Sequence, residues 1–181
     1  MKNNYYYLGP NPTVDAVLIN LLKSPPEILL IKREEKATEG NKWALPGGFH
    51  DSQSTKGTYW ENNKESVLEA LMRELHEETS LDISQQKLKI INIGTYQGNN
   101  RDPRDNKISW SQSHAFLIKV DKEIDLSVIK GKSDAKEAKF FSIDKLPKNI
   151  AFDHLKIITD GLKMLKLSIK NIKNKSKLKN K

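Results

Sequence analysis

Residues 65–81 read ESVLEALMRELHEETSL, and the turn Pro46-Gly47-Gly48 precedes them in the chain. Apolar residues recur in this stretch at intervals of three and four, namely at Val67, Leu68, Leu71, Met72 and Leu75. That spacing places them on one face of an α-helix. We therefore predict an amphipathic helix that begins near Lys64 and ends near Thr79.

Three glutamates of the same stretch, Glu74, Glu77 and Glu78, stand at positions i, i+3 and i+4. On a helix they emerge on one side, where like charges repel. The nearby cation is Arg73, whereas an ordinary solvated face would carry several lysines. Clustered carboxylates suit a hard divalent cation such as Mg²⁺, which polarises phosphoryl groups and lowers the pKa of a bound water. Taken alone, however, an acidic stripe on a helix is more often plain surface.

Apolar runs elsewhere in the chain predict a sheet that packs on this helix. Strands are predicted where such runs are bounded by turn residues, at Val14–Leu22, Glu27–Lys32, Leu88–Tyr96, Ile108–Val120 and Ala138–Ile143. Trp43-Ala44-Leu45 is a further short apolar stretch, and Phe152–Leu167 has the spacing of a second packing helix. The expected fold class is α+β, with a mixed sheet sandwiched between helices.

The bulk composition indicates a single globular domain over residues 1–167. The chain has 181 residues, no cysteine, and no apolar run close to the roughly 20 residues of a membrane-spanning helix. Residues 1–10 lack the apolar segment of a secretory signal. We therefore expect a cytoplasmic protein that has no disulfide and no membrane partner.

The net charge of +8 originates at the C-terminal end of the chain. Of the 31 basic residues, eight are lysines within residues 163–181, where no acid occurs, so that 23 basic residues face 23 acidic ones elsewhere. We expect residues 168–181 to be a solvated, disordered tail, with weak association with RNA or anionic surfaces as the alternative. No aromatic residue interleaves with these lysines, so nucleic acid is not expected as a partner beyond weak tail contacts.

The glycine turn and the helix together resemble the signature of the Nudix hydrolases, Gly-x₅-Glu-x₇-Arg-Glu-U-x-Glu-Glu-x-Gly-U, in which U is a bulky aliphatic residue. The matching residues are Gly48, Glu65, Arg73, Glu74, Leu75, Glu77, Glu78 and Leu81. The resemblance implies an α/β/α sandwich with a mixed, partly antiparallel sheet, and attack of water on a pyrophosphate linkage. It implies that Glu74, Glu77 and Glu78 bind Mg²⁺, or Mn²⁺ as the alternative, and that the Gly48 carbonyl adds one oxygen. It further implies that Glu74 and Glu78 are catalytic and that an ion pair of Arg73 with Glu65 orients the helix.

Two departures from the signature are visible. The spacer from Gly48 to Glu65 has sixteen residues rather than five, so we predict an inserted loop at 49–64 that acts as a lid, a dimer contact or decoration. Tyr59 and Trp60 in this loop either stack on a base or pack on the body of the protein, and we favour packing. Ser80 stands where the family has glycine, and we expect it in a left-handed conformation at a cost of roughly 1 kcal/mol.

Three further stretches resemble the ADP-ribose pyrophosphatase branch: Arg101-Asp102-Pro103-Arg104, Asp134–Phe140 and Ala151-Phe152-Asp153-His154. The resemblance implies hydrolysis of ADP-ribose to AMP and ribose 5-phosphate. Because the diphosphate is anionic, Arg101 and Arg104 are candidates for substrate binding together with Gly48. The alternative is a turn whose arginines lie in solvent. Asp153 is a candidate helix N-cap, and His154 is as well explained by packing at a helix start as by a ligand role.

Several alternatives stay open at this point. The base that activates water is Glu74, or else a carboxylate between Asp121 and Glu137. The substrate is ADP-ribose, or else an oxidised nucleoside triphosphate or a dinucleotide. A non-catalytic sensor of ADP-ribose is the alternative from another class, although the lysine-rich tail is too short for an attached DNA-binding domain. By analogy with the branch, the Tyr5–Leu8 stretch would serve a homodimer interface.

Overall fold

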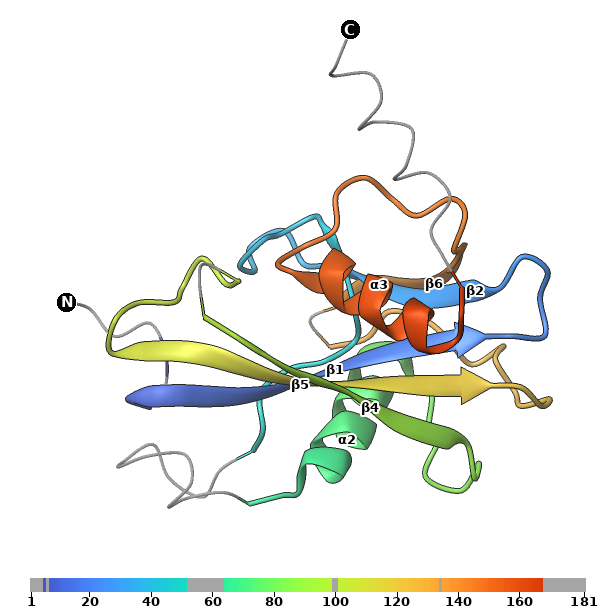
Figure 1. Ribbon diagram of the computed structural model, residues 1–181, viewed down its shortest axis with the longest axis horizontal. Coiled ribbons are helices and arrows are strands. Elements are labelled where there is room, and N and C mark those ends of the chain that lie inside the picture. The colour runs from blue at the N-terminus through green and yellow to red at the C-terminus, as the bar shows by residue number, and fades with distance from the viewer. Residues whose placement is uncertain (1–4, 6, 52–63, 99–100, 134, 168–181) are drawn as a thin grey trace, which may run out of the picture.

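The structure, a computed structural model, describes residues 5, 7–51, 64–98, 101–133 and 135–167. Its elements follow in the order β1 (Gly9–Asn20), β2 (Glu27–Arg33), β3 (Trp43–Ala44), α2 (Val67–Thr79), β4 (Lys89–Gln97), β5 (Ser109–Val120), β6 (Ala135–Ser142) and α3 (His154–Met164). Each predicted strand and both predicted helices are present, and the short apolar stretch at Trp43 forms β3. Figure 1 shows the strands as a twisted layer with α2 and α3 on opposite sides of it.

The six strands form one mixed sheet with the order β3-β2-β1-β5-β4, and β6 pairs with β2. β1 and β5 are parallel, in a register that runs from Gly9 opposite Ser109 to Asn20 opposite Val120. The other pairings, β1 with β2, β2 with β3, β2 with β6 and β4 with β5, are antiparallel. The predicted fold class, an α+β sandwich with a mixed, partly antiparallel sheet, is confirmed.

The apolar run of β1, which Asp15 interrupts, has little alternation because the strand is buried on both faces. Val14, Ala16 and Leu18 point into the core beneath α2, whereas Val17 and Ile19 point into the core beneath α3. All five side chains have no exposed surface. Successive strand residues face opposite sides of a sheet, so two helix-covered faces require apolar residues at every position.

The boundaries of several elements differ from the predicted ones, and β1, β6 and α3 begin at different residues for reasons that the structure shows. β1 begins at Gly9 rather than Val14, because its polar first half also pairs with β5. β6 begins at Ala135 rather than Ala138 for the same reason, through pairing with β2. α3 begins at His154 rather than Phe152, since Phe152 has a left-handed backbone with φ of 52° that cannot belong to a right-handed helix.

Both ends of α2 are capped by local contacts. Ser66 is the N-cap, and its hydroxyl accepts the Glu69 N–H while the Glu69 carboxylate accepts the Ser66 N–H, which is a capping box. The helix therefore begins at Val67, three residues after the predicted Lys64. At the other end Ser80 has φ of 63°, the left-handed conformation expected from the sequence, and its N–H donates to the His76 carbonyl.

Some predictions concern residues outside the described part of the chain. These are Tyr6, Tyr59, Trp60, most of the 49–64 insertion, and the 168–181 tail. Tyr5 and Tyr7 are described, and both are buried within their own chain, whereas Leu8 is exposed. In the described residues no helix is both long enough and apolar enough to cross a membrane.

Replacing Ser80 by glycine is expected to stabilise the protein. Glycine relieves the left-handed strain, and it also removes a buried hydroxyl that has no hydrogen-bond partner among the described residues. We expect the Ser80→Gly variant to gain about 1 kcal/mol of unfolding free energy, or roughly 2–4 °C in Tm. Ser80→Ala separates the two causes, because it removes the hydroxyl but keeps the strain. Equal stability of the two variants would contradict the backbone explanation.

Candidate functional site

The turn Pro46-Gly47-Gly48 lies along β1 in the place of a neighbouring strand. β1 pairs with β2 only at Ile19 and Asn20, which leaves the backbone of its middle to the turn. The Val14 N–H donates to the Gly48 carbonyl at 2.9 Å, and the Ala16 N–H donates to the Pro46 carbonyl at 2.8 Å. A Cβ on Gly47 would stand 2.0 Å from the Val14 carbonyl oxygen. Only glycine allows this approach at position 47.

Two glutamates of α2 lie against the turn. The Gly47 N–H donates to Glu78 Oε2 at 2.8 Å, and Glu78 is 2% exposed. A Cβ on Gly48 would stand 2.5 Å from Glu74 Oε1. The two glycines therefore form a cradle without side chains, into which the carboxylates of Glu74 and Glu78 fit.

Arg73 holds the carboxylates of this region together. Its Nη2 lies 2.6 Å from Glu65 Oε1, and its Nη1 lies 2.9 Å from Glu74 Oε1 and 3.3 Å from Glu77 Oε2. Nη2 also donates to the Phe49 carbonyl at 2.9 Å, directly after the glycine turn. Arg73 thus ties the start of α2, its glutamate face and the turn into one charged cluster.

The pKa values of Glu65 and Arg73 agree with the geometry of their ion pair. Burial alone would raise the pKa of Glu65, but the hydrogen bonds from Arg73 and from the Asp51 N–H hold that pKa below its usual value. The hydrogen bond with Glu65 in turn raises the pKa of the Arg73 guanidinium. Both groups are therefore charged at neutral pH.

The donor set at the turn suits a hard divalent cation. Carboxylate oxygens of Glu74, Glu77 and Glu78 are the ligands that Mg²⁺ prefers, and the glycine cradle leaves room beside two of them. The Gly48 carbonyl already accepts the Val14 N–H and has a second lone pair. Among the described residues, no three acidic or histidine side chains converge as they would around a metal ion, and Arg73 contacts two of the three glutamates. The ligand roles of these four residues remain predictions.

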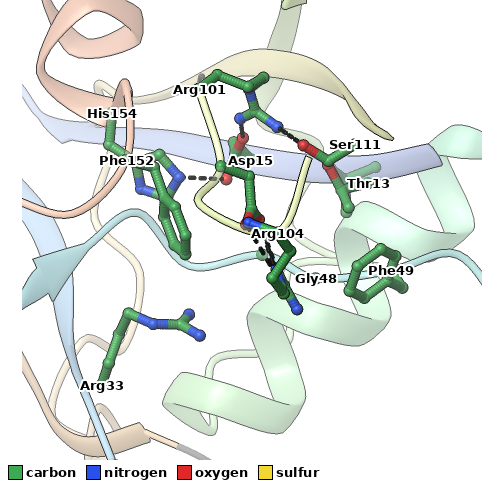
Figure 2. Close-up of a pocket in the computed structure, with 13 residues that line it drawn as sticks. Thr13, Asp15, Arg33, Gly48, Phe49, Arg101, Arg104, Ser111, Phe152 and His154 are labelled. Atoms are coloured by element: carbon green, nitrogen blue, oxygen red, sulfur yellow. Dashed lines mark hydrogen bonds and ion pairs between the residues drawn. The ribbon is translucent and has the colours of Figure 1, made fainter. Parts of the chain in front are cut away.

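A pocket opens beside the glycine turn, on the side of the sheet shown in Figure 2. Its lining comes from β1, the end of β2, the turn, the loop before β5 and the start of α3. The residues that line it are Thr13, Val14, Asp15, Arg33, Gly47, Gly48, Phe49, Arg101, Asp102, Arg104, Ser111, Phe152 and His154. All three predicted substrate-binding residues, Gly48, Arg101 and Arg104, are therefore part of one pocket wall.

Arg101 is buried in this wall rather than extended into solvent. Its Nε and Nη2 donate to Asp153, its Nη1 donates to Ser111 Oγ at 2.9 Å, and its Nη2 lies 3.5 Å from Asp15 Oδ2. Only 8% of the residue is exposed. Burial would lower the pKa of Arg101, but the neighbouring Asp15 and Asp153 raise it above its ordinary value. Arg101 accordingly cross-links β1, β5 and the start of α3.

Asp15 and His154 extend this network to the glycine turn. Asp15 accepts a short hydrogen bond from the Ser113 hydroxyl, and its Oδ1 lies 3.3 Å from His154 Nε2. His154 Nδ1 accepts the Leu45 N–H at 2.9 Å, one residue before the turn begins. Because Nδ1 is an acceptor, the neutral ring carries its proton on Nε2 and directs it toward Asp15. His154 therefore packs at the helix start, as one of the two alternatives had it, and also holds the approach to the turn.

Arg104 lies against two aromatic rings of the pocket region, Tyr5 and Phe49, which also contact each other edge-on. Its guanidinium is 5.4 Å from the centre of the Tyr5 ring and 5.3 Å from that of Phe49. It also pairs with Asp102, with Nη2 2.6 Å from Oδ2. Burial would lower the pKa of Arg104, but this hydrogen bond with Asp102 raises it. Arg104 is only partly exposed, so neither predicted arginine stands free in solvent.

Ion pairs join two of the three stretches that resemble the ADP-ribose pyrophosphatase branch, 101–104 and 151–154. Arg101 pairs with Asp153 across 52 positions, and Asp102 pairs with Arg104 within the stretch 101–104. Asp153 occupies the N-cap position of α3, but its side chain makes no cap hydrogen bond, because it is engaged by Arg101. The predicted N-cap position of Asp153 is therefore confirmed, but its side chain pairs with Arg101 and does not cap the helix.

Sequence reasoning missed two residues of the pocket. Asp15 is an acid inside an apolar run, and a buried charge of this kind requires a partner. The sequence therefore did indicate that Asp15 has a partner. Arg33 ends β2 directly after Lys32, and nothing in the sequence separates it from an ordinary charged strand end.

The predicted base outside the motif is neither excluded nor selected by the structure. The segment between Asp121 and Glu137 packs at the end of α2, where the Lys132 N–H donates to the Glu78 carbonyl at 3.2 Å. No described residue of this segment lines the pocket. Glu74 and this segment remain alternative sources of the base.

Removal of Arg101 is expected to destabilise the fold. The Arg101→Met variant keeps much of the packing volume but leaves the carboxylates of Asp15 and Asp153 without their cation. Losing one partner of a buried ion pair typically costs about 3–5 kcal/mol, so we expect a loss of about 3 kcal/mol in chemical denaturation. Lys163→Met, which removes an exposed cation from Asp160, is the control and should change stability by less than about 0.5 kcal/mol. An equal effect of the two substitutions would contradict the cross-linking role.

His154 is expected to titrate at a lower pH than an ordinary histidine. Burial lowers its pKa, and Asp15 opposes this only in part. A histidine whose folded pKa lies below the unfolded value of about 6.5 stabilises the fold above that pH, and the contribution is lost as the pH falls. In an NMR titration, ring ¹⁵N shifts should show His154 at pH 6.5 mainly as the neutral tautomer protonated on Nε2. A titration midpoint above about 6.5 would contradict the arrangement with Leu45 and Asp15.

Comparison with known proteins is consistent with this architecture. The model of the NUDIX domain matches residues 10–161. The ADP-ribose pyrophosphatase of Methanocaldococcus jannaschii is 36% identical over 163 residues, which are 90% of this chain and 79% of that protein.

Two solved structures share the fold. The NUDIX domain of Shewanella oneidensis NrtR complexed with ADP ribose is 25% identical with a TM-score of 0.66, over 87% of this chain and 89% of that one. A bifunctional NMN adenylyltransferase/ADP ribose pyrophosphatase of Francisella tularensis, complexed with AMP and a Mn ion, is 27% identical with a TM-score of 0.64. There the match covers 87% of this chain and 42% of the other.

Proposed function

Because this chain belongs to the NUDIX family of pyrophosphohydrolases, we propose that its substrate is ADP-ribose. Hydrolysis of the pyrophosphate bond by water would give AMP and ribose 5-phosphate. The observation that carries the proposal is the composition of one pocket wall. The glycines that cradle Glu74 and Glu78 line the same pocket as Arg101 and Arg104, whose guanidinium groups suit a diphosphate. The 36% identity to an ADP-ribose pyrophosphatase supports the same substrate.

We assign metal binding to one side of the glycine turn and substrate binding to the other. Glu74, Glu77 and Glu78, with the Gly48 carbonyl, would hold Mg²⁺ or Mn²⁺. When bound, the cation polarises the phosphoryl oxygens and acidifies a water molecule. Arg73, held by Glu65, keeps the carboxylates of Glu74 and Glu77 in place.

On the other side of the turn, the pocket would hold the substrate. Arg101 and Arg104 place guanidinium groups in its wall, beside which the diphosphate would lie. The buried pair of Asp15 and His154 fixes the backbone from which the turn begins. Preorganised charge of this kind needs no rearrangement during the reaction.

We further propose the organisation of the whole protein. Residues 1–167 would form a single NUDIX domain with the 49–64 segment as an insertion, and residues 168–181 would be a solvated tail. The protein would act in the cytoplasm on small nucleotides, without a membrane partner, and would form a homodimer.

The proposal is tested by hydrolysis of ADP-ribose by wild type and by the Glu78→Gln variant in the presence of Mg²⁺. Glutamine keeps an oxygen that accepts the Gly47 N–H, so the fold should persist while one ligand charge is lost. We expect kcat to fall by orders of magnitude, as on removal of an electrostatic contributor to phosphoryl transfer. Chelation by EDTA should abolish the wild-type activity.

The matched control is Glu69→Gln, an exposed position on the same helix where glutamine can also complete the capping box. Its activity should equal that of wild type. A fall of less than about tenfold in Glu78→Gln, or roughly 1.4 kcal/mol, would refute the metal assignment. Faster turnover of a nucleoside triphosphate or dinucleotide than of ADP-ribose would identify that nucleotide, rather than ADP-ribose, as the substrate. Binding of ADP-ribose without turnover of any nucleotide would favour a sensor.

A further inference from the structure

Three arginines line the pocket, and two of them are already engaged by acids. Arg101 donates from all three of its nitrogens to Asp153 and Ser111, and it is buried. Arg104 is paired with Asp102 through Nε and Nη2. The acids offset the positive charge of these two side chains, and their hydrogen-bonding groups are largely committed to the protein itself.

Arg33, at the end of β2, is placed differently. Its Nε donates to the Thr38 carbonyl at 2.8 Å, which anchors the guanidinium by one edge. Among the described residues it makes no ion pair within 4.0 Å, and none of these residues accepts a hydrogen bond from its Nη1 or Nη2. In Figure 2 the side chain extends toward the space bounded by Phe152 and Gly48. Arg33 thus presents a cation whose two terminal nitrogens are available.

The ring of Phe152 packs against the guanidinium of Arg33. The Arg33 guanidinium lies 5.0 Å from the centre of the Phe152 ring, within the range of a cation–π contact. Phe152 has φ of 52°, a left-handed conformation that a large residue rarely adopts. Such backbone strain concentrates at functional sites, where the surrounding structure maintains it. Here the strained residue holds a planar platform under the guanidinium and lines the same pocket.

We propose that Arg33, stacked on Phe152, binds the diphosphate of the substrate directly, and that Arg101 and Arg104 mainly build the wall around it. The inference rests on the proposed function, since it names the residue that contacts the substrate in that site. A guanidinium anchored through Nε offers Nη1 and Nη2 as a parallel pair of donors, which matches two oxygens of a phosphate group. The anchors at Thr38 and Phe152 restrict the side chain before the substrate arrives, so that less conformational entropy is lost on binding.

The first experiment compares steady-state hydrolysis of ADP-ribose by wild type, Arg33→Gln and Arg33→Lys with Mg²⁺. Arg33 would contact a phosphate group in the ground state as well as in the transition state, so its loss should raise KM more than it lowers kcat. We expect KM to rise roughly tenfold to a hundredfold in Arg33→Gln, the range for loss of a charged hydrogen bond. Arg33→Lys should lie between that variant and wild type, because lysine keeps the charge but not the planar pair of donors.

Lys32→Gln is the matched control. It removes one positive charge from the neighbouring position of the same strand, where the ammonium lies over the Trp43 ring and outside the pocket. Its KM should equal that of wild type. A KM for Arg33→Gln within twofold of the wild-type value would overturn the inference, while turnover of ADP-ribose by the wild type would leave the proposed function standing.

A second measurement does not need turnover. Calorimetric titrations with ADP-ribose and with adenosine, in EDTA, compare a ligand that has the diphosphate with one that lacks it. Arg33→Gln should weaken binding of ADP-ribose roughly tenfold or more and leave that of adenosine unchanged. This result would support the inference even if wild type failed to hydrolyse ADP-ribose and the proposed function fell. Equal weakening for both ligands would indicate a general disturbance of the pocket and would overturn the contact with phosphate.

Discussion

The candidate site depends on the hydrogen bonds that hold the glycine turn against β1. β1 and β2 separate after the pairs Ile19–Ile28 and Asn20–Glu27, so the middle of β1 would expose unpaired backbone groups inside the protein. Such groups cost free energy unless they find partners. The carbonyls of Pro46 and Gly48 supply those partners. One backbone pairing therefore fixes the glycines beneath α2 and sets what the carboxylates of that helix can reach.

Features that depend on neighbours in the sequence were predictable. The apolar spacing located α2, and the position of Ser80 after its last turn predicted a left-handed backbone. The ion pair of Glu65 with Arg73 also joins residues close in the chain. The ends of the strands were less predictable, because register is a property of two strands. Nothing in Gly9–Thr13 alone shows that these polar residues pair with β5.

The pocket shows the limit of sequence reasoning more clearly. The motifs identified Arg101 and Arg104 as cations near the substrate, and both do line the pocket. Their partners could not be inferred, since Asp153 is 52 positions away from Arg101. Such partners decide whether an arginine stabilises the protein or faces the pocket. For this reason Arg33, which has no motif around it, becomes visible only in three dimensions.

The parallel pairing of β1 with β5 has a consequence for folding during synthesis on the ribosome. Gly9 pairs with Ser109, so about a hundred residues lie between the two partners. Contacts this distant in sequence form slowly, because a long loop must close before they contribute. On the ribosome β1 emerges first, and its buried apolar residues, among them Val14, Val17 and Leu18, lack this partner until β5 has been synthesised. The strand at the centre of the finished sheet therefore stays open to aggregation while the intervening chain is made.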